Sequence, residues 1–332
     1  MSSAELSSKS RKSGGEKKVS GAFRRVFKAK EFPIFMALFT LCVVVSFLSP
    51  YFLQVQNIFN VLRQISVIGI LAVGQALIII TGGIDLSVGS VLGLMGVITA
   101  LIANTGLHPL AVFLISIIIG CMVSSLSGLM VTKARINPFI VTLGMMSIAR
   151  GTSLLITGGM PISIDTNKIT ALGSGYLGVV PVPVIIMFIV TILGFIFANK
   201  TLPGRNIYAV GNSERAAKLS GIRVDQVKIM VFAIMGGLCA LSSMIVSGTL
   251  KTAEPGAGTG YEMDVIASVV IGGASLAGGQ GSIIGVIIGA SIMGVLRNSF
   301  VLLGVSAYWQ IIAIGVVTIV AVGIDSLKAR KD

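Results

Sequence analysis

The sequence is poor in charge, because Asp, Glu, Lys and Arg make up only 11% of its 332 residues. An ordinary soluble protein carries about 25%. Hydrophobic residues make up 54% of the chain, which leaves too little polar surface to dissolve a fold of this size in water. The hydrocarbon core of a bilayer takes roughly 20 apolar residues per helix, so lipid accounts for the deficit. The shortage of charge therefore predicts an integral membrane protein and excludes an ordinary soluble fold.

The residues and motifs of common catalytic sites are also missing. His108 is the only histidine, and Cys42, Cys121 and Cys239 lie in apolar runs without metal-like spacing, which argues against a metal site. The chain has no G-x4-G-K-[ST] loop for a nucleotide phosphate and no H-E-x-x-H or G-x-S-x-G motif. We therefore expect no catalytic residue, no metal and no cofactor bound by this chain, and a membrane enzyme is a disfavoured alternative.

Apolar segments fill most of the chain, and Gly-rich breaks split several of them. They predict an all-α polytopic membrane protein with about ten transmembrane helices over residues 32–327. Residues 1–31 form a basic, partly disordered tail, and residues 328–332 a short second tail. The predicted segments are 33–49, 65–81, 86–104, 109–131, 138–157, 182–199, 228–249, 263–279, 282–302 and 306–325.

Glycine is abundant, with 41 residues. Spacings such as Gly89-x3-Gly93 and Gly285-x3-Gly289 predict close helix–helix packing, because small residues let helices in a bilayer approach each other. The pattern Gly82-Gly83-x5-Gly89-x3-Gly93 recurs as Gly278-Gly279-x5-Gly285-x3-Gly289. The recurrence is either an internal repeat, as transporters often contain, or a chance match in a glycine-rich chain.

The basic residues predict which way the helices run. Twenty of the 25 Lys and Arg residues lie in the two tails, at 133–135 and at 200–228. Ten spans place all four of these stretches on one side of the membrane, and the positive-inside rule makes that side the cytoplasm. Both termini are therefore expected to be cytoplasmic. The net charge of +13 is explained by this distribution, so no nucleic-acid partner is expected.

The longest predicted cytoplasmic loop, residues 200–228, contains a helix signal. Ser213 is suited to cap a short helix that begins at Glu214, and Gly221 is suited to end it. Such a helix would lie at the membrane surface as a docking element for a soluble partner. An ordinary solvated loop is the alternative.

Three stretches together resemble the ribose-permease type of sugar-importing ATP-binding-cassette permeases. Gly204–Lys228 resembles the cytoplasmic coupling loop of that family, and Thr81–Ser90 resembles its glycine-aspartate signature. Gly258–Asp264, running into Val270–Gly279, resembles its second signature. The resemblance spans about residues 33–325. One departure is visible, because family members commonly have Gly-Gly-Asn where this chain has Gly211-Asn212-Ser213.

The resemblance implies a pore made of two permease subunits, with a homodimer expected, in a bacterial inner membrane. It also implies a separate cytoplasmic ATPase subunit, which hydrolyses ATP to drive transport, and an extracytoplasmic sugar-binding protein. Coupling to the ATPase is expected within residues 204–228. The candidate coupling residues are Gly204, Arg205, Tyr208, Gly211, Glu214, Ala216, Ala217, Leu219 and Gly221.

Polar residues inside apolar segments are candidates for the translocation pathway. An ionisable side chain that faces lipid costs about 2.5–3.5 kcal/mol or more, so Asp85 and Arg150 are expected to face protein or water. Asp85 either caps the next helix together with Ser87 or gates the inner end of the pathway, and Arg150 either pairs with a carboxylate or lies along the route. Uncharged amides suit sugar hydroxyls, although helix–helix hydrogen bonds are their alternative. The candidates are Gln75, Asp85, Ser87, Asn137, Arg150, Glu262, Asp264 and Gln310.

The sequence therefore favours the membrane subunit of an ATP-driven importer for ribose or a related monosaccharide. A permease of the same superfamily for another small solute, such as a signal furanose, a nucleoside or an amino acid, is the first alternative. An ATP-independent secondary transporter or channel is the second, and the scarcity of intramembrane carboxylates speaks against it. The sugar itself and the choice between homodimer and heterodimer are not encoded in any recognisable residue pattern.

Overall fold

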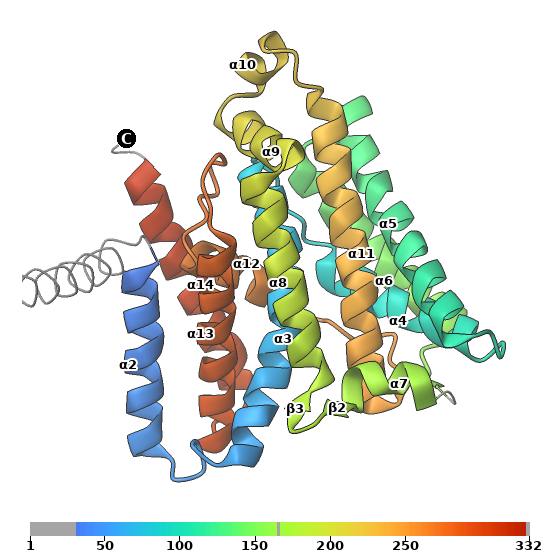
Figure 1. Cartoon of the computed structure of the whole chain (residues 1–332), viewed down its shortest axis with the longest axis vertical. Coiled ribbons are helices and arrows are strands. Elements are labelled where there is room, and N and C mark those ends of the chain that lie inside the picture. The colour runs from blue at the N-terminus through green and yellow to red at the C-terminus, as the bar shows by residue number, and fades with distance from the viewer. Residues whose placement is uncertain (1–30, 165–166, 330–332) are drawn as a thin grey trace, which may run out of the picture.

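A computed structural model of the chain describes residues 31–164 and 167–329, which are almost entirely helical (Figure 1). The predicted basic tail lies outside the described residues except for Glu31, and so do residues 330–332 of the second tail.

Each of the ten predicted apolar segments overlaps a helix, although α3 begins ten residues before the predicted segment 65–81. Six of the helices described here, α3, α5, α6, α8, α11 and α13, are long and apolar enough to cross a membrane, whereas α2, α4 and the apolar part of α14 are shorter. The helices are α2 (Phe32–Leu48), α3 (Val55–Ile80), α4 (Val88–Ala103), α5 (Pro109–Lys133), α6 (Pro138–Thr157), α8 (Val182–Lys200), α11 (Val224–Leu250), α12 (Tyr261–Ile271), α13 (Ile283–Leu302) and α14 (Ala307–Ala329).

Helix α12 corrects the predicted segment 263–279. It has 11 residues, so it is only about 16 Å long at 1.5 Å per residue. The chain leaves the helix after Ile271, and Gly273, Gly278 and Gly279 then take positive φ values of +87°, +88° and +73°. These conformations are open to glycine and strained for other residues. The apolar run is therefore a short helix followed by a glycine loop.

Short elements mark the two ends of the molecule (Figure 1). At one end, called here the β2–β3 end, lie α7 (Asn167–Ser174) and the hairpin of β2 (Tyr176–Leu177) with β3 (Val180–Pro181). Strand β1 (Ile162–Ser163) pairs antiparallel with β4 (Thr252–Ala253). At the other end, called the α9–α10 end, lie α9 (Leu202–Asn212) and α10 (Glu214–Leu219).

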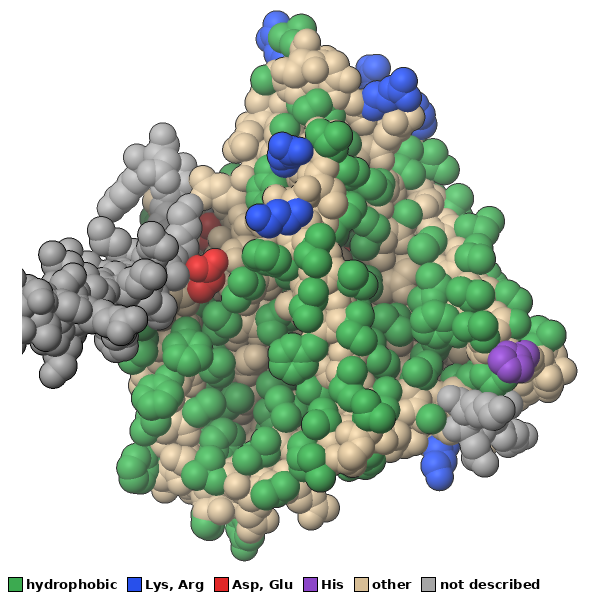
Figure 2. Space-filling model, viewed as in Figure 1, with side chains coloured by type: hydrophobic (Ala, Val, Ile, Leu, Met, Phe, Trp, Pro, Cys, Tyr) green, Lys and Arg blue, Asp and Glu red, His purple; other side chains and the backbone are tan. Residues whose placement is uncertain are grey.

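Helix α3 lies at the centre of the fold. Every residue from Ile65 to Ile80 is buried, because α8, α11, α12 and α13 all pack against it. The peripheral helices α5, α6 and α8 instead expose many large apolar side chains, and Figure 2 shows apolar atoms over most of the molecule's side. Contiguous apolar surface of this extent suits lipid rather than water. The prediction of an all-α polytopic membrane protein is therefore supported by the fold.

Most Lys and Arg side chains on the face drawn in Figure 2 lie toward the α9–α10 end. Several of them belong to the stretch 200–228, which forms that end of the molecule. The C-terminal end of α14 lies toward the same end (Figure 1). Lys133 lies at this end too, because it pairs with Asp225 in the first turn of α11. Within the described part of the chain, the basic stretches 133–135 and 200–228 are therefore grouped in space as the sequence analysis grouped them.

Candidate functional site

The segment at the α9–α10 end has the local structure that its sequence predicts. The Ser213 hydroxyl accepts a hydrogen bond from Ala216 N at 3.2 Å and caps α10. Gly221 follows α10 with a φ of +81°, so both predicted helix signals are confirmed. The Thr201 hydroxyl caps α9 in the same way, through Gly204 N at 3.1 Å. Side-chain caps satisfy N–H groups that have no partner within the helix.

The predicted coupling residues divide into an exposed and an inward-facing group. Leu219 is an apolar side chain that is 84% exposed at the tip of the molecule, and Glu214 forms an ion pair with Lys228 beside it. The exposed residues are Arg205, Glu214, Ala216, Leu219 and Gly221. The inward-facing residues, buried or half-buried, are Gly204, Tyr208, Gly211 and Ala217.

The inward-facing residues of α9 contact two other segments through backbone atoms. A Cβ atom on Gly211 would overlap the carbonyl oxygen of Ile80, at the end of α3. Gly279 N donates a hydrogen bond to the same Ile80 oxygen at 2.8 Å. A Cβ on Gly278 would lie 3.0 Å from Gly211 O and 3.2 Å from Gly82 Cα. We call this meeting of Ile80, Gly82, Gly211, Gly278 and Gly279 the glycine junction, and it has no room for a side chain at Gly211 or Gly279.

Tyr208 adds a side-chain contact to the glycine junction. Its hydroxyl donates to Gly281 O at 3.1 Å. Burial raises the pKa of the Tyr208 phenol above its ordinary value, because the charged phenolate is disfavoured away from water. The hydroxyl therefore keeps the proton that it donates to the glycine loop.

The glycine loop, residues 272–282, is also held by the first and last described helices. The Asp325 carboxylate of α14 accepts from Leu276 N at 3.0 Å. Glu31, just before α2, accepts from the Ser282 hydroxyl at 2.7 Å. Segments from α2, α3, α9 and α14 thus converge on one loop between α12 and α13. A displacement of α9 must therefore shift the glycine loop or break its contacts.

A second backbone contact lies along α4. Gly89, Gly93 and Gly96 share one face of this helix. A Cβ on Gly93 would lie 2.9 Å from Ala257 O, and a Cβ on Gly89 would overlap Gly258 O. The partner of Gly89 and Gly93 is the non-helical segment that leads from β4 to α12, so the prediction that Gly89-x3-Gly93 packs against another helix was wrong. Gly89 and Gly93 of α4 thus let this irregular backbone pack directly against a helix. Gly96 instead lies against Ser247 of α11.

The second glycine spacing does pack two helices, as predicted. A Cβ on Gly285 would overlap Gly272 O, and one on Gly289 would overlap Ser268 O. Both partners belong to α12 or the residue that follows it, so α13 presses directly on the short helix. The two copies of the recurring glycine pattern therefore have different partners, one a loop and the other a helix.

Arg150 holds the same non-helical segment from the side of α6. Its Nη1 donates to Pro255 O at 2.7 Å and to Ala257 O at 3.0 Å. The Ser153 hydroxyl also donates to Pro255 O, at 3.3 Å. Of the two roles weighed for Arg150, a structural one is therefore present, but through backbone carbonyls rather than a carboxylate. Glu262 begins α12 next to this segment, where it accepts from Gly260 N at 3.2 Å.

Four other pathway candidates occupy separate places. The Asp85 carboxylate is 1% exposed and accepts from Ser87 N at 2.8 Å and Ser87 Oγ at 2.6 Å, just before α4. Among the residues that the structure describes, no side chain caps the first N–H groups of that helix, so both roles weighed for Asp85 stay predictions. Asn137 caps α6 by accepting from Phe139 N at 2.9 Å. Gln75 is fully buried in α3, and neither polar atom of its amide has a hydrogen-bond partner in the described part of the chain.

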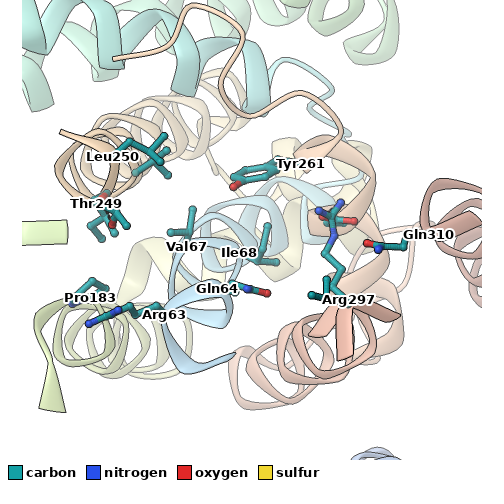
Figure 3. A pocket seen from close by; sticks show the side chains of 14 residues that line it. Arg63, Gln64, Val67, Ile68, Pro183, Thr249, Leu250, Tyr261, Arg297 and Gln310 are labelled. Carbon is teal, nitrogen blue, oxygen red and sulfur yellow. Dashed lines mark hydrogen bonds and ion pairs between the residues drawn. The ribbon is translucent and has the colours of Figure 1, made fainter. Parts of the chain in front are cut away.

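The last two candidates, Asp264 and Gln310, line one cavity of about 410 Å³, which we call the Asp264 cavity (Figure 3). It lies toward the β2–β3 end, because it is lined by the early turns of α3 and the last turns of α11 and α13. Its lining is Arg63, Gln64, Val67, Ile68, Pro183, Ile245, Val246, Thr249, Leu250, Tyr261, Asp264, Arg297, Val301 and Gln310.

An ion pair dominates the polar side of the Asp264 cavity. Oδ2 of Asp264, a side chain that is 1% exposed, lies 2.7 Å from Arg297 Nη2. In Figure 3 Arg297 and Gln310 lie together, across the cavity from Thr249, with Tyr261 between the two sides. Near the far rim Arg63 lies over the Tyr176 ring, 4.8 Å from its centroid. Carboxylate, guanidinium, amide and phenol groups therefore surround one space.

Sequence reasoning missed several of these residues. Arg297 has a clear signal, because it is a cation inside an apolar segment, as Arg150 is. Tyr261 lies in a motif that was recognised, but nothing in its spacing indicates a cavity. The contact of Ile80 with Gly211 joins positions that are far apart in the sequence through backbone atoms, and no residue type signals such a contact.

The comparisons with known proteins agree with this architecture. A family model described as "Branched-chain amino acid transport system / permease component" matches residues 57–322. The ribose import permease protein RbsC of Bacillus subtilis is 42% identical over 297 residues, which cover 89% of this chain and 92% of the relative. RbsC of Escherichia coli K12 is 44% identical, covering 88% and 92%. The xylose transport system permease protein XylH of Haemophilus influenzae is 33% identical, covering 92% and 99%.

No solved structure matches the chain. The family match covers more than half of the sequence, and both ribose permeases are similar to it almost from end to end. The apolar helical fold suits a membrane protein, and the chain belongs to this family of permease components of transport systems.

Proposed function

We propose that this chain is the pore-forming subunit of an ATP-driven importer for ribose or a related monosaccharide, located in the bacterial cell membrane. The substrate class rests on the relatives, since the most similar ones named above are ribose permeases and another is a xylose permease. ATP would be used by a separate cytoplasmic ATPase. An extracytoplasmic sugar-binding protein and a second permease subunit, most simply another copy of this chain, complete the proposed assembly.

The proposed topology has ten crossings with both termini in the cytoplasm. The grouping of basic residues at the α9–α10 end supports this orientation. On this proposal α12 crosses together with the non-helical segment before it, because 11 helical residues are too few to cross alone. The β2–β3 end, with the Asp264 cavity, then faces the outside.

The observation that carries the proposal is the glycine junction. An ATPase can act on this chain only through surface that it reaches, and the exposed tip of α10 with Leu219 offers such a surface. Gly211 and Tyr208 join α9 to the glycine loop and to the end of α3. Movement imposed on α9–α10 would therefore pass directly to α3, α12 and α13, which also line the Asp264 cavity. This is a physical route from ATP hydrolysis to alternating access.

Reconstitution tests the proposal. The chain is purified alone or with its ATPase and binding protein, placed in liposomes, and supplied with labelled ribose, xylose or leucine. We expect uptake of a pentose that requires all components and ATP. Uptake of leucine, without uptake of ribose or xylose, would favour the amino-acid permease alternative. Uptake by the chain without ATPase or ATP would overturn the proposed mechanism in favour of a secondary transporter.

A further inference from the structure

The Asp264 cavity has the composition of a small-molecule site rather than of a packing defect. Its volume of about 410 Å³ falls within the range of about 300–1,000 Å³ that small-molecule pockets occupy. Apolar side chains of α3 and α11 form most of its wall, and a few polar groups from α12, α13 and α14 converge on it. This combination fixes the orientation of a ligand while burying its apolar surface.

The Asp264–Arg297 pair is incompletely satisfied. Oδ1 of Asp264 and Nε of Arg297 are buried and have no hydrogen-bond partner in the described part of the chain. A buried polar group without a hydrogen bond is destabilising, because it has lost its bonds to water and gained none in return. The pair therefore presents an acceptor and a donor, side by side, that a ligand in the cavity can satisfy.

The charges of this pair select the class of ligand. The carboxylate and the guanidinium neutralise each other at 2.7 Å, so an anionic ligand would meet the Asp264 charge and a cationic ligand the Arg297 charge. A neutral ligand with several hydroxyls can donate to the carboxylate and accept from the guanidinium at once. The Gln310 amide, which already donates to Val305 O at 2.9 Å, adds an acceptor oxygen.

Tyr261 supplies the second feature of a carbohydrate site. Its half-buried ring lies between the polar and the apolar sides of the Asp264 cavity (Figure 3). An aromatic ring offers a flat apolar surface with a polar hydroxyl at its edge. A sugar presents C–H groups on one face and hydroxyls around its rim, which matches this arrangement.

We propose that the Asp264 cavity is a binding subsite for a neutral monosaccharide within this chain, with Asp264 and Arg297 binding adjacent hydroxyls and Tyr261 covering the apolar face. The inference rests on the proposed function for its choice of sugar. It adds a specific site to that function, because transport by itself requires only a passage.

Cysteine protection in the purified chain tests the subsite without any partner protein. Cys42, Cys121 and Cys239 are replaced by alanine, and Thr249, on the cavity wall, by cysteine. We expect D-ribose at about ten times its dissociation constant to slow maleimide labelling of T249C about tenfold, because roughly one site in eleven then remains free. D-ribonate, an anion, and glycine betaine, which has no hydroxyl, should give little protection. A T105C variant, exposed between α4 and α5, should be unaffected by every solute.

Two substitutions connect the protection to the named side chains. In the T249C background, Tyr261→Leu should raise the ribose concentration for half-protection several-fold, and Asp264→Asn should do the same. Tyr308→Leu, at an 81% exposed tyrosine outside the cavity, should leave that concentration unchanged. A circular dichroism spectrum and a gel-filtration profile identical to those of the parent identify the variants that are folded.

The outcomes separate this inference from the proposed function. If the complete transporter takes up ribose but ribose does not protect T249C, the proposed subsite is wrong and the proposed importer function is retained. Protection without ATP-dependent uptake supports the subsite and overturns the importer. Equal protection by ribonate and ribose overturns the assignment to a neutral sugar.

Discussion

The two ends of this molecule are built on opposite principles. At the α9–α10 end, the glycine junction brings backbone against backbone, and no side chain fits between Gly211 and Ile80. At the β2–β3 end, side chains from six helices surround the open Asp264 cavity. Substitutions should therefore act sterically at the first end, where one methyl group is too much. At the second end they should act through charge and shape, in graded steps.

The largest effect is expected for Gly211→Ala. The added methyl group would overlap Ile80 O, and overpacking of this kind costs about 1–3 kcal/mol. We expect ATP-driven uptake to be lost while the protein still inserts into the membrane. Gly144→Ala in α6 is the control, because a Cβ there meets nothing within 4 Å. Normal uptake by Gly211→Ala would mean that the junction tolerates separation and is not the route of coupling.

The next prediction compares one backbone conformation at the two ends. Gly221 after α10 and Gly106 between α4 and α5 have φ values of +81° and +80°, with open space around both. Valine at either position strains the backbone by about 1–3 kcal/mol. We expect Gly221→Val to lose uptake and copurification of the ATPase, and Gly106→Val to keep both. If both variants lose uptake and ATPase copurification equally, backbone strain itself would be the cause, and the position of Gly221 beside α10 would not matter.

Arg150→Gln tests the contact that holds the non-helical segment between β4 and α12. It removes charged donors from the carbonyls of Pro255 and Ala257, and hydrogen bonds to a charged group are worth about 1.5–3 kcal/mol each. We expect a lower melting temperature in detergent and reduced uptake, both followed beside Arg135→Gln, a substitution of an exposed arginine. Unchanged melting would show that the glycine face of α4 holds the non-helical segment without help.

A smaller effect is expected for Asp264→Asn at the β2–β3 end. The amide loses the charge attraction to Arg297, but the Arg297 side chain is 37% exposed, so water stabilises its freed charge. Initial rates of pentose uptake should fall several-fold, whereas ATP hydrolysis by the assembled transporter should persist. Asp225→Asn, which removes an exposed ion pair with Lys133 at 3.1 Å, is the matched substitution. Loss of ATP hydrolysis in Asp264→Asn would place this residue in coupling instead.

The smallest effect is expected for Asp85→Asn. The asparagine oxygen can accept the same hydrogen bonds from Ser87 N and Oγ, because asparagine and aspartate side chains both bond the backbone two residues on. Uptake should stay within about twofold of the parent, and Asp85→Leu should lower it further. A large loss in the asparagine variant would show that the charge of Asp85 matters, in favour of a place on the pathway.

Sequence reasoning succeeded where the signal is local. The apolar runs placed the helices, and Ser213 and Gly221 set the ends of α10, because capping and positive φ depend on single residues. It failed at segment 263–279, where apolar composition continues beyond Ile271 although the helix does not. It also failed for Gly89 and Gly93, because glycine permits close approach without saying whether a helix or a loop approaches.

The candidate site was predictable in its residue types but not in its grouping. Asp264 and Gln310 were singled out as polar groups in apolar segments, and the fold places both on one cavity with Arg297 and Tyr261. Gln75, Asp85, Asn137 and Arg150 met the same criterion and lie elsewhere. A polar side chain within an apolar segment needs a hydrogen-bonding or charged partner. Which group becomes that partner depends on how the helices pack together.

The sequence by itself determined three properties of this protein. It is embedded in lipid, its helices lie along the apolar segments, and its positive charge is gathered on one side. Those properties follow from composition and short-range patterns, since solvation by lipid and helix formation act on each segment separately. Only the tertiary structure decided that Gly211 meets Ile80 and Gly279, and that Asp264 pairs with Arg297 at the wall of an open cavity. These contacts join residues from distant parts of the chain, so they exist only once the helices have packed.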